Sequence, residues 1–193
     1  RSIRDTSVTA QGAGLVDLDN DGYPDVLFVT GSVYPEVEKK LPQYPYKTPR
    51  VLFRNLGNGT FEELETQGGA GITTAHSSRG CAFGDFDNDG DADLAVTNNR
   101  ATGGTISILV NKGNGSFATA VNFPAGQTPY KITVAKINND NLMDIVVGND
   151  GQKMNILFNG GSNNFSNRVE KNVQDEVWSA DIAANVEAAD MDN

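Results

Sequence analysis

A short acidic motif occurs three times along this 193-residue chain, and a fourth copy begins in its last four residues. Each copy places oxygen-bearing side chains at alternate positions, and each complete copy runs directly into an apolar segment. The complete copies span 17–25, 85–93 and 136–144, and the fourth starts at Asp190. Successive copies therefore begin 68, 51 and 54 residues apart (17 to 85, 85 to 136 and 136 to 190). A repeat of about fifty residues is typical of stacked β units, each of roughly four strands.

The motif has the residue types that bind calcium. Ca²⁺ takes about six to eight oxygen ligands, and a loop with acids at positions 1, 3, 5 and 9 can supply them together with the backbone carbonyl of position 7. Position 6 needs a positive φ, which Gly22 and Gly90 adopt freely and Asn141 tolerates. Position 2 is always apolar, so we expect it to point into a core. The predicted calcium ligands of the first two loops are Asp17, Asp19, Asp21, Tyr23, Asp25, Asp85, Asp87, Asp89, Asp91 and Asp93.

The other two copies are less complete. In the third, Lys136 replaces the first acid, and the remaining candidate ligands are Asn138, Asp140, Leu142 and Asp144. Two interpretations stay open: the Lys136 ammonium pairs with Asp140 and Asp144 in place of a metal, or it turns away and water completes the site. The fourth copy offers Asp190 and Asp192.

The segments around the loops predict β-strands. An EF-hand is excluded because its position 12 is Glu, whereas here that position is Phe28 or Val96. The apolar runs after the loops read as buried strands, and each is followed by a second strand, an Asn, a hairpin turn and a Phe. We therefore expect an all-β array over 1–193. Its predicted repeats cover 9–66, 76–122, 128–170 and part of a fourth, 178–193.

The first repeat carries an insertion of about a dozen residues. It lies between Gly31 and Pro49 and is rich in proline and tyrosine, which is incompatible with a regular strand. Such a segment either takes part in recognition, since Tyr combines apolar area with a hydroxyl, or is a passive surface loop.

The chain resembles the FG-GAP/VCBS repeat family, which includes the integrin-α-type propellers. The resemblance covers nearly the whole chain and is most specific over 79–94, where Phe83-Gly84 precedes the acidic loop. It implies a β-propeller, commonly of seven blades, with calcium loops between the first two strands of a blade. The residues here would form about three four-stranded blades and the start of a fourth, so we expect them to be part of a longer chain.

Charge limits the classes of partner. The net charge is −10, and twelve of the 25 acids occupy positions 1, 3, 5 and 9 of the four copies, so the acidity is mainly a metal signature. Binding to nucleic acid or to an anionic membrane is therefore not expected. No apolar run is long enough to predict membrane insertion.

Calcium-binding loops are typical of extracellular proteins, so we expect the protein to be secreted or on the cell surface. Three sequons are either glycosylation sites or simply good turn sequences; they begin at Asn58, Asn114 and Asn164.

Nothing in the sequence predicts an enzyme. His76 and Cys81 occur without an activating motif, and we interpret them as a surface histidine and a small core residue. The favoured function is a calcium-binding extracellular module for adhesion, or for recognition of a glycan or protein ligand. The alternatives are the non-catalytic propeller of a larger secreted enzyme and a self-associating subunit of an extracellular filament.

Overall fold

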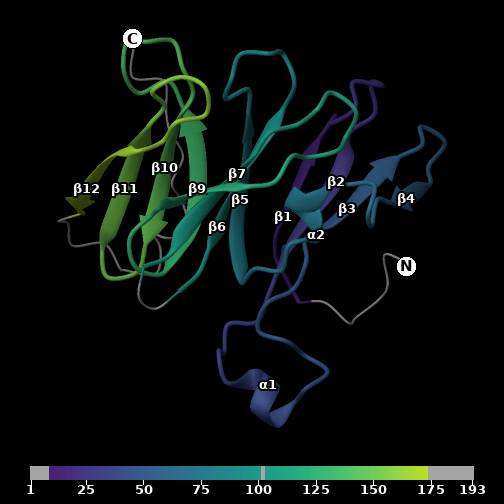
Figure 1. Cartoon of the computed structure of the whole chain (residues 1–193), viewed down its shortest axis with the longest axis horizontal. Helices are drawn as coiled ribbons and strands as arrows, with labels where there is room; N and C mark the ends of the chain where they lie inside the picture. The colour runs from purple at the N-terminus through teal and green to yellow at the C-terminus, as the bar shows by residue number, and fades with distance from the viewer. Residues whose placement is uncertain (1–8, 101–102, 174–193) are drawn as a thin grey trace.

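The computed structural model describes residues 9–100 and 103–173. Within these ranges the protein forms three four-stranded antiparallel sheets and two four-residue helices (Figure 1). The first sheet contains β1 (Ala10–Val16), β2 (Asp25–Thr30), β3 (Val51–Asn55) and β4 (Phe61–Glu63). The second contains β5 (Ser78–Gly84), β6 (Asp93–Asn98), β7 (Thr105–Leu109) and β8 (Val121–Pro124). The third contains β9 (Pro129–Ala135), β10 (Asp144–Asn149), β11 (Lys153–Phe158) and β12 (Asn167–Asn172). The all-β prediction is confirmed.

Each sheet is a meander in which strand order follows chain order. The second strand of each sheet is the most buried, and every residue of β6 and β10 is buried. Along β6 the side chains alternate between two cores: Leu94 and Val96 pack toward the first sheet, whereas Ala95 packs toward the third. This alternation is the two-residue period of a strand that is covered on both faces.

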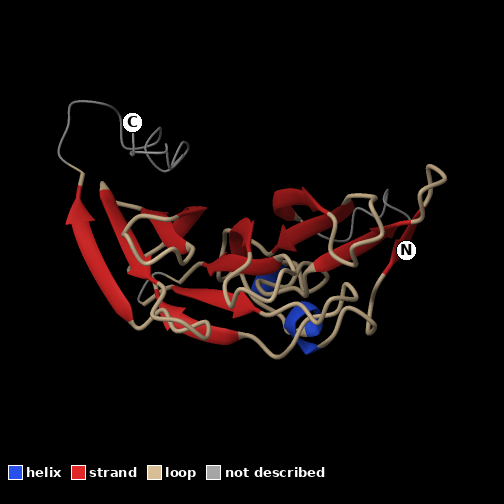
Figure 2. Ribbon diagram, turned by 90° about the horizontal axis from the view of Figure 1, so that it is seen from above, coloured by secondary structure: helices blue, strands red, loops and turns tan. Residues whose placement is uncertain are grey.

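The three sheets approach one another along their first strands. β5 contacts both β1 and β9, while the fourth strands β4, β8 and β12 are mostly exposed. Seen from above, the sheets follow one another across the molecule (Figure 2). Glycine makes the close approach possible, because a Cβ on Gly12 would lie 2.8 Å from the Arg79 carbonyl oxygen and one on Gly80 would lie 2.5 Å from that of Tyr130.

The apolar residue at position 2 of each loop shows how neighbouring sheets cover one another. Leu18 is 1% exposed in the core between the first and second sheets, and Phe86 is fully buried in the core between the second and third. The prediction that position 2 points into a core is thus confirmed for two loops. It is wrong for Ile137, which is 40% exposed. In the first two loops the residue at position 2 is covered by the following sheet. Ile137 is exposed because the described residues contain no sheet after the third.

The phenylalanine after each Asn-Gly-type turn packs in the opposite direction. Phe117 lies in the core shared with the first sheet, and Phe165 lies in the core shared with the second. Phe61 belongs to the first sheet and is 40% exposed. Where a neighbouring sheet is present, a sheet therefore inserts its phenylalanine against the sheet before it and the residue at position 2 of its loop against the sheet after it.

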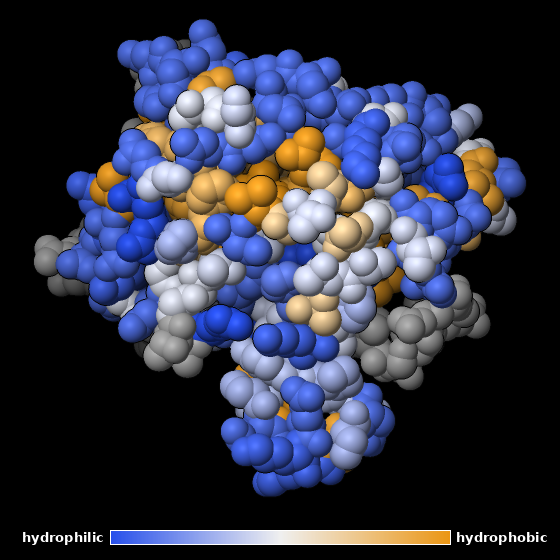
Figure 3. Space-filling view, in the orientation of Figure 1, coloured by the Kyte–Doolittle hydropathy of each residue, from blue (hydrophilic) through white to orange (hydrophobic). Residues whose placement is uncertain are grey.

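The insertion in the first repeat projects from the end of the sheets. It contains the helix α1 (Val37–Lys40) and appears at the bottom of Figure 1. The second helix, α2 (Ala70–Thr73), lies in the connection between the first and second sheets. Apolar side chains gather across the middle of the face shown in Figure 3, whereas the α1 lobe is largely hydrophilic. No helix in the described ranges is long and apolar enough to cross a membrane.

Candidate calcium sites

The three complete acidic loops connect the first two strands of each sheet. Because successive strands are antiparallel, these loops lie at the same end of the sheets as the turns between the third and fourth strands. The sequons that begin at Asn58, Asn114 and Asn164 all occur in those turns, and the three asparagines are exposed. Each asparagine Oδ1 accepts a hydrogen bond from the backbone N–H two residues later, so the sequon also forms the turn.

The backbone of the first two loops has positive φ at two positions. Gly22 and Gly90 at position 6 have φ of 90° and 93°, as predicted, and Asn141 in the third loop has φ of 64°. Asn20 and Asn88 at position 4 have φ of 59° and 61°. The sequence shows Asn at position 4 in every copy, and in the first two loops this left-handed conformation, which Asn tolerates, explains the choice of residue.

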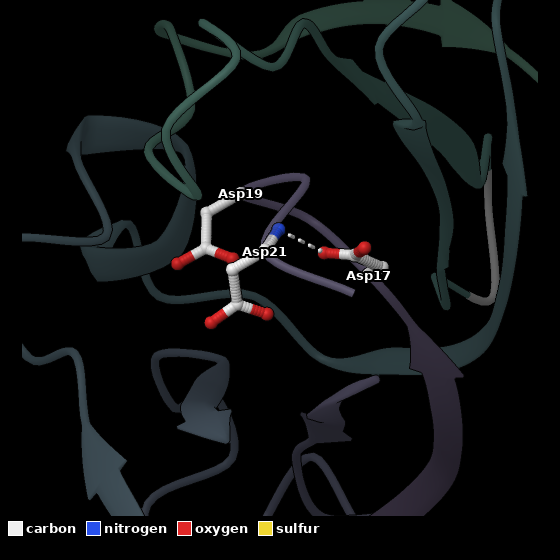
Figure 4. Close-up of side chains that lie close together, drawn as sticks. All are labelled: Asp17, Asp19 and Asp21. Carbon is white, nitrogen blue, oxygen red and sulfur yellow. Dashed lines mark hydrogen bonds between the residues drawn. The ribbon is translucent and has the colours of Figure 1, made fainter. Parts of the chain in front are cut away.

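In the first loop, Asp17, Asp19 and Asp21 each place a carboxylate oxygen within 4.8 Å of the other two (Figure 4). Asp17 is held in place because its two oxygens accept hydrogen bonds from the backbone N–H groups of Asp21 and Gly22, at 3.2 and 2.8 Å. In the second loop the corresponding group is Asp85, Asp87 and Asp93, and Asp85 accepts the same two backbone hydrogen bonds from Asp89 and Gly90.

The acid at position 3 carries an oxygen without a partner in both loops. Oδ1 of Asp19 and Oδ1 of Asp87 are buried and accept no hydrogen bond. The other oxygen of each residue is engaged: Asp19 Oδ2 lies 3.8 Å from the Arg54 guanidinium, and Asp87 Oδ2 accepts from Asn163 Nδ2 at 3.2 Å. A buried carboxylate oxygen with no donor is costly unless a cation faces it. The donor set, all hard oxygen, fits Ca²⁺.

The acid at position 9 has a second role that the sequence did not reveal. In each loop its two oxygens accept backbone hydrogen bonds from position 2 and from the Asn at or just after the end of the third strand. For Asp93 these donors are Phe86 and Asn111, at 3.0 and 2.8 Å. Asp25 and Asp144 repeat both contacts at the same distances. All three acids are buried. Position 9 therefore joins the loop to the third strand as well as offering oxygen to a metal.

The Asn that donates to position 9 also connects neighbouring sheets. Asn111 Nδ2 donates to the Leu18 carbonyl of the preceding loop, and Asn159 Nδ2 donates to that of Phe86, each at 2.8 Å. The loops of the first and second sheets also meet directly, since Asn20 Nδ2 donates to Asp91 Oδ1 at 2.8 Å. A metal that orders one loop therefore also supports the next sheet.

Burial makes the carboxylates at position 9 of the first two loops difficult to ionise. It raises the pKa of Asp93 to about 6, and repulsion from Asp87 and Asp89 adds to the increase, while the hydrogen bonds from Asn111 and Phe86 oppose it. Burial also raises the pKa of Asp25. A bound cation would offset the repulsion and favour the charged form.

This pKa gives a pH prediction for the calcium-free protein. Because the pKa of Asp93 is higher in the folded chain than its ordinary value of 3.8, the folded state holds this proton more tightly. The stabilisation linked to this proton is present below about pH 4 and is lost as the pH rises through about 6; the stabilisation from the two backbone hydrogen bonds to Asp93 is a separate contribution. In protein stripped of calcium beforehand, the wild-type advantage over Asp93→Asn in urea unfolding should therefore be larger at pH 4 than at pH 7. A pH-independent difference would contradict the assignment.

The third loop departs from the other two. Asp140 N–H donates to Asn138 Oδ1 at 3.1 Å, and Leu142 N–H donates to Asp140 Oδ1 at 2.9 Å, so a compact turn forms. Asn139 at position 4 is not among the described residues with positive φ. Lys136 is exposed and makes no ion pair with any described residue, so the pairing with Asp140 and Asp144 that the sequence suggested is not seen. Asp190 and Asp192 of the fourth copy lie outside the described residues.

His76 and Cys81 lie away from the acidic loops. Burial lowers the pKa of His76 to about 4, with further lowering by the positive charges of Arg50, Lys47 and Arg100. Cys81 is a partly buried free thiol that packs against the core between the first two sheets, and burial raises its pKa to about 11. A thiol with that pKa is protonated at neutral pH and is a poor nucleophile.

Comparison with protein families matches two overlapping parts of the chain, residues 17–96 and 85–147, to the FG-GAP-like repeat. Each match contains acidic loops and the strands that follow them. A search of curated proteins finds no match. The matches extend over more than half of the chain and confirm the resemblance read from the loops and from Phe83-Gly84. The protein therefore belongs to the FG-GAP-like repeat family.

Proposed function

We propose that this protein is a calcium-binding β-propeller module that serves recognition outside the cell. The observation that carries the calcium proposal is the buried, unpartnered Oδ1 of Asp19, repeated at Asp87 in the next loop. The same unpartnered atom occurs at position 3 of both loops, as expected if each loop binds a cation in the same geometry. FG-GAP repeats often bind calcium, which supports the same assignment.

Five residues of each loop would hold the ion. In the first loop these are Asp17, Asp19, Asp21, the Tyr23 carbonyl and Asp25; in the second they are Asp85, Asp87, Asp89, the Asp91 carbonyl and Asp93. Bound calcium would supply two positive charges among four acids and a set of short bonds across the loop. Its role is structural, since it would connect the end of the first strand to the start of the second. We propose no catalytic function for the chain.

The packing of the sheets supports a propeller. Contacts between sheets concentrate on the first two strands, while the fourth strands lie at the outer edges and are mostly exposed. Sheets that meet along their inner strands diverge toward their outer strands, which is the radial arrangement of blades. FG-GAP repeats are typical of extracellular proteins, where calcium is plentiful, and this supports a recognition role there.

Terbium luminescence tests the first site. Tb³⁺ replaces Ca²⁺ in oxygen sites, and an aromatic ring within a few ångströms sensitises its emission. Tyr23 is the tyrosine within the first loop, and it would coordinate through its backbone carbonyl, so Tyr23→Phe should lose the sensitised emission and keep the site. We expect emission in the wild type that excess Ca²⁺ removes and that Asp19→Asn abolishes. Emission that survives both treatments would contradict calcium binding in this loop.

A further inference from the structure

A cationic hollow lies at the end of the sheets opposite the calcium loops. It has a volume of about 260 Å³, and its lining includes Lys47, His76, Asn99, Arg100 and Asn122. Lys47 comes from the connection between β2 and β3, His76 from the connection between the first two sheets, and Arg100 from the connection between β6 and β7. The family match and the acidic loops do not account for it.

Backbone hydrogen bonds fix the three segments side by side. Thr48 and His76 exchange two N–H to carbonyl bonds of 3.1 Å each, which places Lys47 beside the histidine. Asn99 N–H donates to the Ser77 carbonyl at 2.7 Å, and the Tyr46 hydroxyl donates to the Asn99 carbonyl at 3.2 Å. The hollow is therefore formed by the fold and does not depend on a chance arrangement of long side chains.

The floor of the hollow is a satisfied polar network. Asn98 is 4% exposed, and its Oδ1 accepts from the guanidinium of buried Arg50 at 3.3 Å. Its Nδ2 donates to the hydroxyls of Thr105 and Ser107, at 3.3 and 2.7 Å. Ser107 in turn donates to Asn122 Oδ1 at 2.7 Å. The side-chain Nδ2 groups of Asn99 and Asn122 donate no hydrogen bond to any described residue and remain available to a ligand.

The charge of the hollow contrasts with that of the protein. The chain carries −10 overall, yet no aspartate or glutamate lines this hollow. Lys47 and Arg100 are exposed and form no ion pair within the described residues, and Arg50 adds a third positive charge beneath them. Burial is the main cause of the lowered pKa of His76, and the nearby charges of Arg50, Lys47 and Arg100 lower it further. Cations and neutral N–H donors together match the acceptor oxygens of an anion.

We propose that this hollow binds a single oxyanion group, either a sulfate or carboxylate carried on a sugar or the free inorganic anion. Two cations and two amide groups in about 260 Å³ suit one such group. The acidity of the rest of the chain disfavours a long polyanion, which would meet repulsion beyond the hollow. The site goes beyond the proposed calcium function and does not depend on it.

Calorimetric titration of the whole chain tests the site. The probes are sodium sulfate, sodium acetate, N-acetylglucosamine 6-sulfate and unsulfated N-acetylglucosamine, at constant ionic strength. We expect at least tenfold tighter binding of the sulfated sugar than of its neutral partner. Tighter binding of the sulfated sugar than of inorganic sulfate assigns the ligand to a glycan, and equal affinity assigns it to the free anion. No binding of any charged probe at 10 mM overturns the proposal.

A charge-matched pair of double variants separates a built site from general electrostatics. Lys47→Gln with Arg100→Gln removes two exposed cations from the hollow, whereas Lys112→Gln with Arg168→Gln removes two exposed cations elsewhere. The first pair should weaken binding of the sulfated sugar at least tenfold, and the second should change it less than twofold. Equal losses in both would overturn the proposal. The melting temperature measured in calcium should be the same for the two double variants, which excludes unfolding as the cause of any loss of sugar binding.

Discussion

Asp93→Ala should be one of the most damaging single substitutions in the acidic loops. Asp93 is fully buried, and its removal leaves the backbone N–H groups of Phe86 and Asn111 without acceptors. Each unsatisfied buried donor costs about 1–3 kcal/mol, so we expect a loss of about 3 kcal/mol in the free energy of unfolding even without calcium. Urea unfolding in EGTA measures this loss.

Asp89→Ala in the same loop is the matched control. Asp89 is exposed and its side chain accepts one local hydrogen bond, from Asp91 N–H at 2.9 Å. Its substitution should weaken calcium binding but change the stability of the calcium-free protein by less than about 1 kcal/mol. If the two variants were equally stable in EGTA, position 9 would have no structural role apart from the metal.

Removal of calcium should lower stability by more than any single loop substitution. A ligand at roughly a hundred times its Kd stabilises a folded protein by about 2.7 kcal/mol per site, so two sites contribute about 5 kcal/mol. For a chain of this size that corresponds to a decrease in Tm of roughly 10–20 °C. The measurement is a pair of thermal melts, one in excess calcium and one in EGTA.

Two comparisons identify the source of that decrease. Excess Mg²⁺ should restore little of the stability, because the loops offer many protein oxygens and Mg²⁺ prefers to keep its water ligands. Asp19→Asn and Asp87→Asn should each reduce the calcium-dependent part of Tm by about half. A Tm unaffected by EGTA would be incompatible with structural calcium in these loops.

The loop signature predicted much of the local geometry that the structure shows at the end of the sheets that carries the acidic loops. The positive φ of Gly22 and Gly90 and the burial of Leu18 and Phe86 follow from position alone, because the loop geometry is local. The burial of Ile137 was wrongly predicted. Ile137 would be buried only if another sheet packed against it, and the nine-residue loop pattern does not indicate whether such a sheet follows.

Other features needed three dimensions. Asp93 read as a metal ligand, but its two backbone hydrogen bonds join residues 7 and 18 positions away, so only the folded sheet shows them. The cationic hollow brings together Lys47, His76 and Arg100 from three separate connections. In the sequence these residues are scattered among many acids, and no spacing rule links them.

The most direct test of calcium binding is a count of bound ions by calorimetric titration of the metal-free protein with Ca²⁺. We predict two bound ions per protein molecule for the wild type, one for each of the single variants Asp19→Asn and Asp87→Asn, and none for the double variant. The predicted sites then account for every ion through the two buried carboxylate oxygens. A titration without binding, or a stoichiometry that the double variant leaves unchanged, would contradict the account.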